Sequence, residues 1–237
     1  MRKLTGAAFV SLDGVMQAPG GPDEDPTSGF RLGGWVQPFW DAEMGPFEDL
    51  IMGEYDLLLG KRTYDIFAAY WPDNQDNPIG AKFQRINKYV LTHSAEPLAW
   101  DNSHKLSGET AAAVAELKQS AGRDLLIQGS STLYPALLSA RLIDLLMLTT
   151  FPLVLGKGKR IFDGSEKPGA LKLVDHFVSP KGVSIATYEP AGDVPTGSFA
   201  TKPPSEAELE LREKIKDGAW WASSSSGTRS AATRRRF

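Results

Sequence analysis

Residues 56–65 read Asp-Leu-Leu-Leu-Gly-Lys-Arg-Thr-Tyr-Asp, an apolar run that leads through glycine into two cations and a threonine. The apolar run predicts a buried strand over 55–60, and apolar residues at helical spacing predict a helix over 62–71. A glycine turn that opens a helix suits a phosphate group, because the first helical N–H groups lack internal partners and the helix dipole favours an anion there. An ordinary strand-to-helix turn with two solvated cations fits this segment equally well. The candidate phosphate ligands are Gly60, Lys61, Arg62 and Thr63.

The composition is that of a globular protein with an acidic body. The chain has 237 residues, of which 41% are apolar and 23% are charged, and its formal net charge is −3. The last fifteen residues hold four arginines and no acid, so residues 1–222 carry 22 basic against 29 acidic residues, a net charge of −7. Nucleic-acid-binding surfaces cluster lysine and arginine to neutralise phosphates, so we expect no nucleic-acid partner.

Cysteine is absent, which excludes disulfides, thiol catalysis and thiolate metal sites and fits a cytoplasmic protein. The histidines show no metal-ligand spacing, so we expect no metal site. The N-terminal apolar run is broken by Gly6 and stops before Asp13, which makes it too short for a secretory signal. The longest apolar stretch, residues 142–155, contains Asp144 and Pro152, whereas a membrane-spanning helix needs about 20 apolar residues. We therefore expect no membrane segment.

Strand and helix patterns alternate over the first two-thirds of the chain, and two strands pair at its end. This order predicts an α/β protein with a mixed, mostly parallel sheet, helices on both faces and an antiparallel hairpin at the end of the domain. Turn residues predict a loop over 72–80, and the Gly, Pro and Asp residues of 17–34 are typical of a flap over a site or of an unstructured segment. The predicted strands are 3–12, 88–92, 124–128, 142–150, 171–178 and 182–189, and the other predicted helices are 38–53 in two pieces, a helix capped by Ser107 that ends near Ala121, and one that follows 129–132.

The composition changes after Pro190. Residues 1–190 are predicted to form the folded domain, and residues 191–222 read as a linker with a short charged helix over 206–215. Residues 223–237 contain four consecutive serines and three consecutive arginines without the apolar residues that a core requires. This composition predicts a disordered tail.

A second strand-to-helix turn, Gly129-Ser130-Ser131-Thr132-Leu133, resembles the first because small residues and hydroxyls precede a predicted helix. Its amides and hydroxyls suit a second phosphate or a ribose, although serine and threonine are also common ordinary helix caps. Thr92 follows a predicted strand, where its hydroxyl fits either a nucleotide contact or a simple turn. The glycine–cation cluster 156–160 fits a solvated hairpin slightly better than a third ligand contact. Neither a Walker motif nor a Gly-x-Gly-x-x-Gly motif is present in the sequence.

Two carboxylates are candidates for substrate chemistry, although a solvated surface charge is the ordinary role for each. Asp13 follows the first predicted strand, and the carboxyl ends of parallel strands form the usual binding crevice of α/β proteins. Asp41 lies near Trp35, Phe39 and Trp40 in the sequence. A carboxyl group among aromatic side chains has a raised pKa that suits proton donation.

Four motifs in order resemble the reductase domain of the bacterial riboflavin-biosynthesis deaminase-reductase and, more distantly, dihydrofolate reductase. They are Ser11–Gly14, Leu59–Tyr64, Leu126–Leu133, and Pro152–Gly158 followed by Ile161 and Phe162. The resemblance covers about residues 3–190, and we expect no zinc deaminase domain like that of the bifunctional enzymes. It implies a dihydrofolate-reductase-like three-layer α/β/α fold, NADPH as the hydride donor, and a homodimer.

The resemblance also implies site residues. It places Asp41 as the proton donor and Asp13, Trp35 and Gln128 at the substrate. Gln128 stands where riboflavin reductases usually have glutamate, and Gly-Ser-Ser replaces the Gly-Gly pair of dihydrofolate reductase. The implied function is reduction of a small heterocycle such as 5-amino-6-(5-phosphoribosylamino)uracil, with pterin reduction or nucleotide binding without reductase activity as alternatives. The implied cofactor ligands are Gly60, Lys61, Arg62, Thr63, Thr92, Gly129, Ser130, Ser131, Thr132 and Leu133.

Overall fold

The computed structural model describes residues 1–216. The chain divides into two compact units, Met1–Val194 and Pro195–Phe237. The described part of the second unit contains α6 (Glu206–Lys216), whose side chains are all exposed. Its bounds agree to within one residue with the helix predicted over 206–215. The predicted disordered tail, residues 223–237, lies outside the described residues. Within residues 1–216, no helix has both the length and the apolar content needed to span a membrane.

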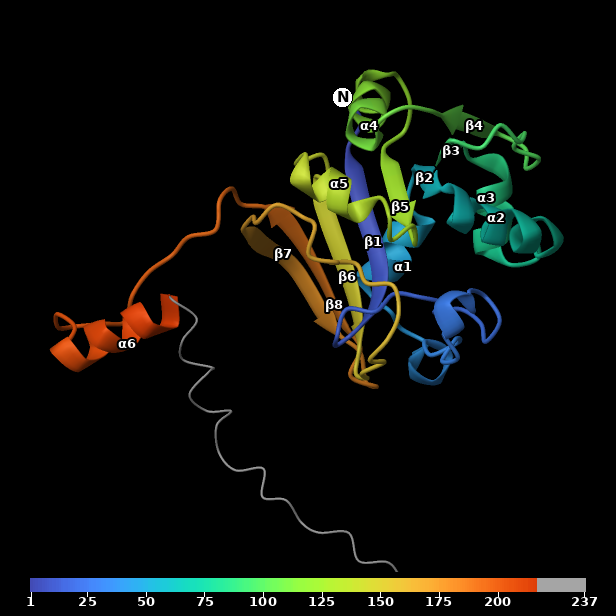
Figure 1. Cartoon of the computed structure of the whole chain (residues 1–237). Coiled ribbons are helices and arrows are strands. Elements are labelled where there is room, and N and C mark those ends of the chain that lie inside the picture. The colour runs from blue at the N-terminus through green and yellow to red at the C-terminus, as the bar shows by residue number, and fades with distance from the viewer. Residues whose placement is uncertain (217–237) are drawn as a thin grey trace, which may run out of the picture. The chain divides into compact units, whose positions relative to one another are not determined.

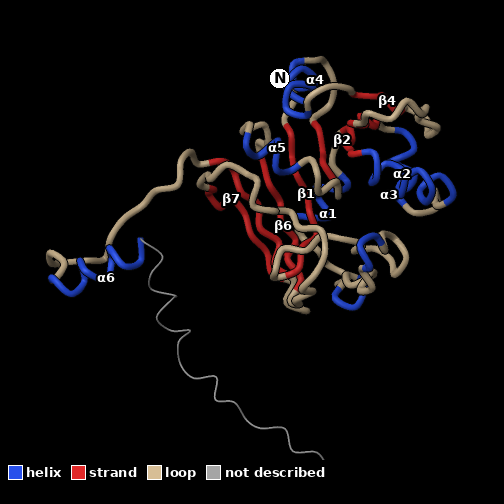
Figure 2. The backbone as a smooth tube through the Cα atoms, in the orientation of Figure 1, coloured by secondary structure: helices blue, strands red, loops and turns tan. Residues whose placement is uncertain are grey.

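The first unit is built on one eight-stranded sheet in the order β4-β3-β2-β5-β1-β6-β8-β7. All neighbours from β4 to β6 are parallel, while β8 runs antiparallel to both β6 and β7. Figure 2 draws the strands of this sheet in red. The predicted mixed sheet with its closing antiparallel hairpin is therefore confirmed. The strands are β1 (Leu4–Ser11), β2 (Asp56–Gly60), β3 (Lys88–Leu91), β4 (Ser103–Leu106), β5 (Leu125–Gln128), β6 (Leu145–Phe151), β7 (Leu171–Val178) and β8 (Ser184–Pro190).

Helices cover both faces of this sheet and make the predicted α/β/α layers (Figure 1). The alternation of β2 shows the division, because Leu57 and Leu59 belong to one apolar core and Leu58 to the other. The first core lies under α1 (Pro46–Met52), α2 (Lys61–Tyr70) and α3 (Pro78–Arg85). The second lies under α4 (Thr110–Gln119) and α5 (Tyr134–Ser139). Short 3-10 turns occupy Thr27–Gly29, Gln37–Phe39 and Trp71–Asp73.

Several local predictions differ from the structure. The first piece of the predicted helix over 38–53 is wrong, because only the 3-10 turn Gln37–Phe39 lies there before α1 begins at Pro46. The predicted loop over 72–80 is wrong at its end, because Asn77 accepts a hydrogen bond from the Ile79 N–H and starts α3. Ser107 is not the cap of α4. The Glu109 carboxylate caps this helix instead, because it accepts hydrogen bonds from the N–H groups of Ala111 and Ala112. Strand β4 was missed because its side chains are mostly exposed and polar.

A buried ion pair fixes the amino ends of two strands. Arg2 lies two residues before the start of β1, and its Nη2 atom lies 2.6 Å from Oδ2 of Asp56, the first residue of β2. Both side chains are only 2% exposed. The Arg2 Nε also donates to the carbonyl oxygen of Arg123, just before β5. Three adjacent strands are thereby joined at the edge opposite their carboxyl ends.

We predict that Asp56→Ala lowers the free energy of unfolding by about 3–5 kcal/mol, because it leaves the Arg2 guanidinium buried without its counter-ion. Urea denaturation followed by circular dichroism measures the change. Glu54→Ala is the matched control, since Glu54 pairs with Arg123 in the solvent and is 80% exposed. The control is expected to lose less than about 1 kcal/mol. Equal losses in the two variants would contradict the anchoring role of Arg2 and Asp56.

Candidate active site

A pocket of about 1460 Å³ opens at the carboxyl edge of the parallel strands. Gly60, Leu91 and Gln128 reach it from the last positions of β2, β3 and β5. The chain leaves β1 toward the β4 edge and leaves β5 toward the β7 edge, so the winding direction reverses beside the pocket. Such a reversal is the usual place for a ligand crevice in α/β proteins.

The two glycine turns that the sequence singled out lie against each other in this pocket. The Gly60 N–H donates to the Ser130 hydroxyl oxygen at 3.0 Å, and the Ser130 N–H donates to the Thr63 hydroxyl oxygen at 3.0 Å. Gly129 and Ser130 both have left-handed backbone conformations, with φ of 65° and 58°. A Cβ atom on Gly129 would lie 3.1 Å from the Thr63 methyl group, so the close contact of the turns also favours glycine.

One half of the pocket offers donors for an anion. Helix α2 begins at Lys61, and among residues 1–216 no side chain caps its first turn. Its free N–H groups and the Arg62 guanidinium therefore face the pocket rim together. The Lys61 ammonium is partly committed, since it lies 2.7 Å from the Asp65 carboxylate one turn along α2. That hydrogen bond raises the pKa of Lys61 above its ordinary value.

The other half of the pocket is aromatic. Phe9 of β1 and Phe47 of α1 have ring centroids 5.0 Å apart, and Phe67 and Trp71 form an edge-on pair at 6.2 Å. Gln128 also lines the pocket, and its buried Oε1 atom accepts no hydrogen bond from the described residues. Aromatic walls with a few polar groups are typical of sites for flat heterocycles.

Most of the predicted ligand residues therefore share one pocket. Thr92 lies at its wall beyond β3, 6% exposed, and its hydroxyl oxygen accepts from the Ser94 N–H at 3.0 Å. The predicted residues that line the pocket are Gly60, Lys61, Arg62, Thr63, Thr92, Gln128, Gly129, Ser130, Ser131, Thr132 and Leu133. Asp13, Trp35 and Asp41 do not line it.

Asp13 is engaged in holding a turn. Its carboxylate accepts hydrogen bonds from the Ser11 hydroxyl at 2.6 Å and from the N–H groups of Leu155 and Gly156 at 3.0 and 2.9 Å. Arg160 pairs with it at 3.2 Å. These hydrogen bonds, Ser11 foremost, hold the pKa of Asp13 well below its ordinary value. The carboxylate thus stabilises the 153–160 turn at the pocket rim.

Trp35 and Asp41 are also engaged in contacts within the chain. The Trp35 indole is buried, and its N–H donates to the Gln17 carbonyl oxygen at 2.8 Å. Asp41 accepts from the Lys181 N–H at 3.0 Å. A hydrogen bond from Ser179, followed by the contact with Lys181, lowers the pKa of Asp41. The expected raised pKa is therefore wrong, because these donors favour the ionised carboxylate more than its surroundings disfavour it. The role of Asp41 as proton donor stays a prediction that this geometry does not favour.

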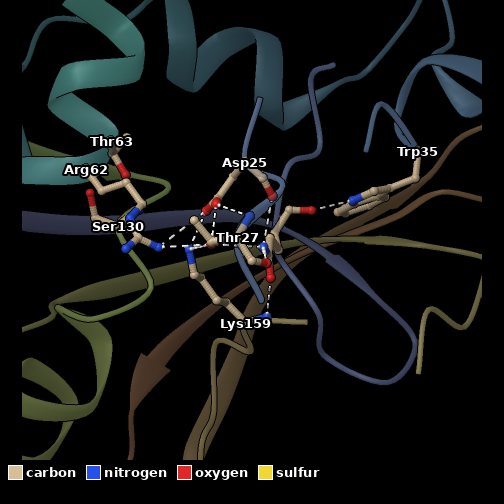
Figure 3. A network of polar contacts seen from close by, with 8 residues as sticks. Asp25, Thr27, Trp35, Arg62, Thr63, Ser130 and Lys159 are labelled. Atoms are coloured by element: carbon tan, nitrogen blue, oxygen red, sulfur yellow. Dashed lines mark hydrogen bonds and ion pairs between the residues drawn. The ribbon is translucent and has the colours of Figure 1, made fainter. Parts of the chain in front are cut away.

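The segment 17–34 is anchored in the structure, and it supplies pocket residues that the sequence reasoning missed. Figure 3 shows Asp25 and Thr27 of this segment meeting Arg62 and Lys159. Glu24 lines the same wall, and burial raises its pKa above the ordinary value despite hydrogen bonds from two backbone N–H groups. The length and glycine content of the segment signalled a flap, but nothing local signalled which acid meets which cation.

Residues 2–185 match the family model described as the RibD C-terminal domain. The chain belongs to this family. It is 25% identical over 184 residues to the uncharacterized protein YyaP of Bacillus subtilis (strain 168). The alignment covers 76% of this chain and 90% of that protein.

Solved structures share the fold at low identity. A structure from Shewanella sp. PV-4, named as a riboflavin biosynthesis protein, aligns with a TM-score of 0.60 at 19% identity over 80% of this chain and 99% of that one. The diaminohydroxyphosphoribosylaminopyrimidine deaminase/5-amino-6-(5-phosphoribosylamino)uracil reductase of Thermotoga maritima aligns with a TM-score of 0.54 at 14% identity. The alignment covers 80% of this chain and 57% of that one. The fold predicted for this chain, a mixed α/β sheet with an antiparallel pair at its end, is thus shared with these structures.

We predict that Asp13→Asn destabilises the protein in a pH-dependent way. The folded pKa of Asp13 lies below its unfolded value, so its stabilisation is complete above about pH 4 and is lost as the pH falls toward the folded pKa. The difference in melting temperature between wild type and variant is therefore expected to be largest at about pH 6 and to shrink below about pH 4. Asp73→Asn, at an exposed aspartate, is the control and should show a small, constant difference. A constant difference for Asp13→Asn would contradict the stabilising role of its charge.

Proposed function

We propose that the protein is an NADPH-dependent reductase of a small heterocyclic substrate. The observation that carries the proposal is the pair of glycine turns joined by hydrogen bonds at the mouth of one pocket. The family supports an oxidoreductase, since the Thermotoga relative is a reductase by name. A ribosylaminopyrimidine is the substrate class that this name suggests.

The anion half of the pocket fits a dinucleotide phosphate. Gly129 keeps the second turn free of a side chain where a Cβ would press on Thr63. The uncapped N–H groups of α2 and the Arg62 side chain would hold phosphate oxygens, and Ser131 and Thr132 would meet the neighbouring part of the cofactor. NADPH, when bound, supplies the hydride.

The aromatic half fits the acceptor. Phe9 and Phe47 would stack against a flat ring. The Gln128 side-chain Oε1, which accepts no hydrogen bond from the described residues, would accept one from a ring N–H or an amino group. These side chains would place the substrate and exclude water; the accompanying proton would come from a pocket acid or from solvent. Cytoplasmic location and assembly as a homodimer stay predictions. A nucleotide-binding protein without reductase activity is the alternative that the altered Gln128 position favours.

Titration of the purified protein with NADPH, followed by fluorescence and calorimetry, tests the cofactor. Arg62→Ala is expected to weaken binding by roughly tenfold or more, because hydrogen bonds to charged groups are stronger than neutral ones. Arg31→Ala removes an exposed arginine outside the pocket lining and is the matched control. Absence of NADPH binding to the wild type would overturn the proposed function, and unchanged affinity in Arg62→Ala would exclude the phosphate role of that side chain.

The geometry also predicts the outcome for Asp41. Because Asp41 contacts Lys181 and does not line the pocket, Asp41→Asn should keep the turnover of a reducible pterin or aminopyrimidine within about twofold, far less than the roughly 10²–10⁴-fold that a general acid contributes. NADPH absorbance follows the reaction. A loss above roughly a hundredfold, together with loss of one limb of the pH–rate profile, would restore Asp41 as the donor.

A further inference from the structure

Two cations at the anion half of the pocket share one carboxylate of the 17–34 segment. Lys159 forms an ion pair with Asp25 Oδ2, and the Arg62 Nη1 atom lies 3.7 Å from the same oxygen. Lys159 comes from the 156–160 turn and Arg62 from the start of α2, so three distant segments meet at Asp25 (Figure 3). The cation that belongs to the candidate phosphate site is thus already paired within the chain.

Thr27 completes this contact. Its hydroxyl donates to Asp25 Oδ1 at 2.5 Å and accepts from the Lys159 ammonium at 2.9 Å and from Arg62 at 3.3 Å. Burial alone would raise the pKa of Asp25, but the hydrogen bonds from Lys159 and Thr27 outweigh it and lower the pKa below its ordinary value. Asp25 therefore carries its negative charge at neutral pH.

The backbone around the carboxylate is held in place. The Gln17 side-chain amide donates to the carbonyl oxygens of Asp25 and Thr27 at 2.9 and 3.0 Å, and its Oε1 accepts from the Lys159 N–H at 3.0 Å. The Asp25 side chain is only 10% exposed, whereas that of Arg62 is 57% exposed. A fixed carboxylate is thus surrounded by donors of the kind that a phosphate oxygen accepts from.

We propose that Asp25 is an internal stand-in for a ligand phosphate, and that Lys159 is a further phosphate ligand which becomes available when the incoming phosphate displaces Asp25. The inference rests on the proposed function for the identity of the ligand, while the competition itself concerns any phosphate group at this end of the pocket. The Asp25 carboxylate and a phosphate at this position would share the positive charge of Lys159 and Arg62 and would repel each other, so each anion weakens the binding of the other. Ligand affinity is accordingly reduced by the free energy of the internal ion pairs.

A double-mutant cycle tests the competition. The wild type, Asp25→Asn, Lys159→Met and the double variant are titrated with NADPH and, separately, with inorganic pyrophosphate by calorimetry, and melting temperatures confirm folding. Asp25→Asn is expected to tighten binding of both probes by roughly three- to tenfold, the range that partly exposed ion pairs contribute together. Lys159→Met should weaken binding little in the wild type and several-fold more in the Asp25→Asn background, because only there is the ammonium free.

Two further variants control the experiment. Asp23→Asn removes an exposed charge of the same segment without an ion pair among the described residues, and it should change affinity by less than about twofold. Thr27→Val keeps the shape and the Asp25 charge, loosens the contact, and should tighten binding in the same direction; it also serves if Asp25→Asn does not fold.

The outcomes separate the two proposals. Pyrophosphate binding that tightens in Asp25→Asn, with no NADPH binding in any variant, supports the competition and overturns the cofactor. NADPH binding that is unchanged or weaker in both Asp25→Asn and Thr27→Val overturns the competition and leaves the reductase standing. Equal tightening by Asp23→Asn would reduce the effect to general charge and also overturn it. An effect of Lys159→Met that is the same in both backgrounds would exclude Lys159 as the released ligand.

Discussion

The two hydrogen bonds between the glycine turns hold the candidate site together. Gly60 ends β2 and Ser130 closely follows β5, its parallel neighbour, and each turn uses its backbone N–H on a hydroxyl oxygen of the other. The helices that follow leave on opposite faces of the sheet, so the turns are the place where both helical layers meet one pocket. Had either hydroxyl been a methyl, one backbone N–H would lack its partner, and only the other hydrogen bond would join the turns.

The fold was predictable because its decisive signals are local. The strands β2 and β5 each contain three consecutive apolar residues shortly before a glycine, and their burial on both faces is what a central parallel strand requires. Pro46 opens α1, at the first helical position that proline favours. Helix α3 was hidden because its buried face includes Gly80 and Lys82, whose ammonium donates to a backbone carbonyl oxygen of α1. A lysine whose burial depends on a partner in another helix gives no apolar periodicity for a pattern to detect.

The glycine turns of the site were predictable because their signals are local, whereas the roles of the carboxylates were not. Residues that bind through backbone geometry, such as Gly60 and Gly129, can be recognised in the sequence by their position at or just after the end of a strand. Carboxylates act through charge, and a carboxylate's partner is set by tertiary packing. Asp13 meets Arg160 and Asp41 meets Lys181, each across most of the length of the folded unit, so the role of either acid depends on contacts that no local spacing encodes. The aromatic neighbours of Asp41 in sequence therefore gave the wrong direction for its pKa.

The pocket thus has two kinds of wall with different consequences for recognition. The turns at β2 and β5 are held by hydrogen bonds from the backbone N–H of each to a hydroxyl of the other, so the chain itself fixes their geometry. Asp25 and Thr27 of the 17–34 segment contact the site through ion pairs and hydrogen bonds, while Ala18 and Phe30 of the segment are buried in the first apolar core. The polar contacts exchange partners at small net free energy because a ligand oxygen can take the place of a carboxylate or hydroxyl oxygen. A phosphate-bearing ligand would interact with the rigid wall by shape and with the exchangeable wall by charge. Neutral ligands of similar shape would meet the rigid wall alone, and they would leave Asp25 with its cations.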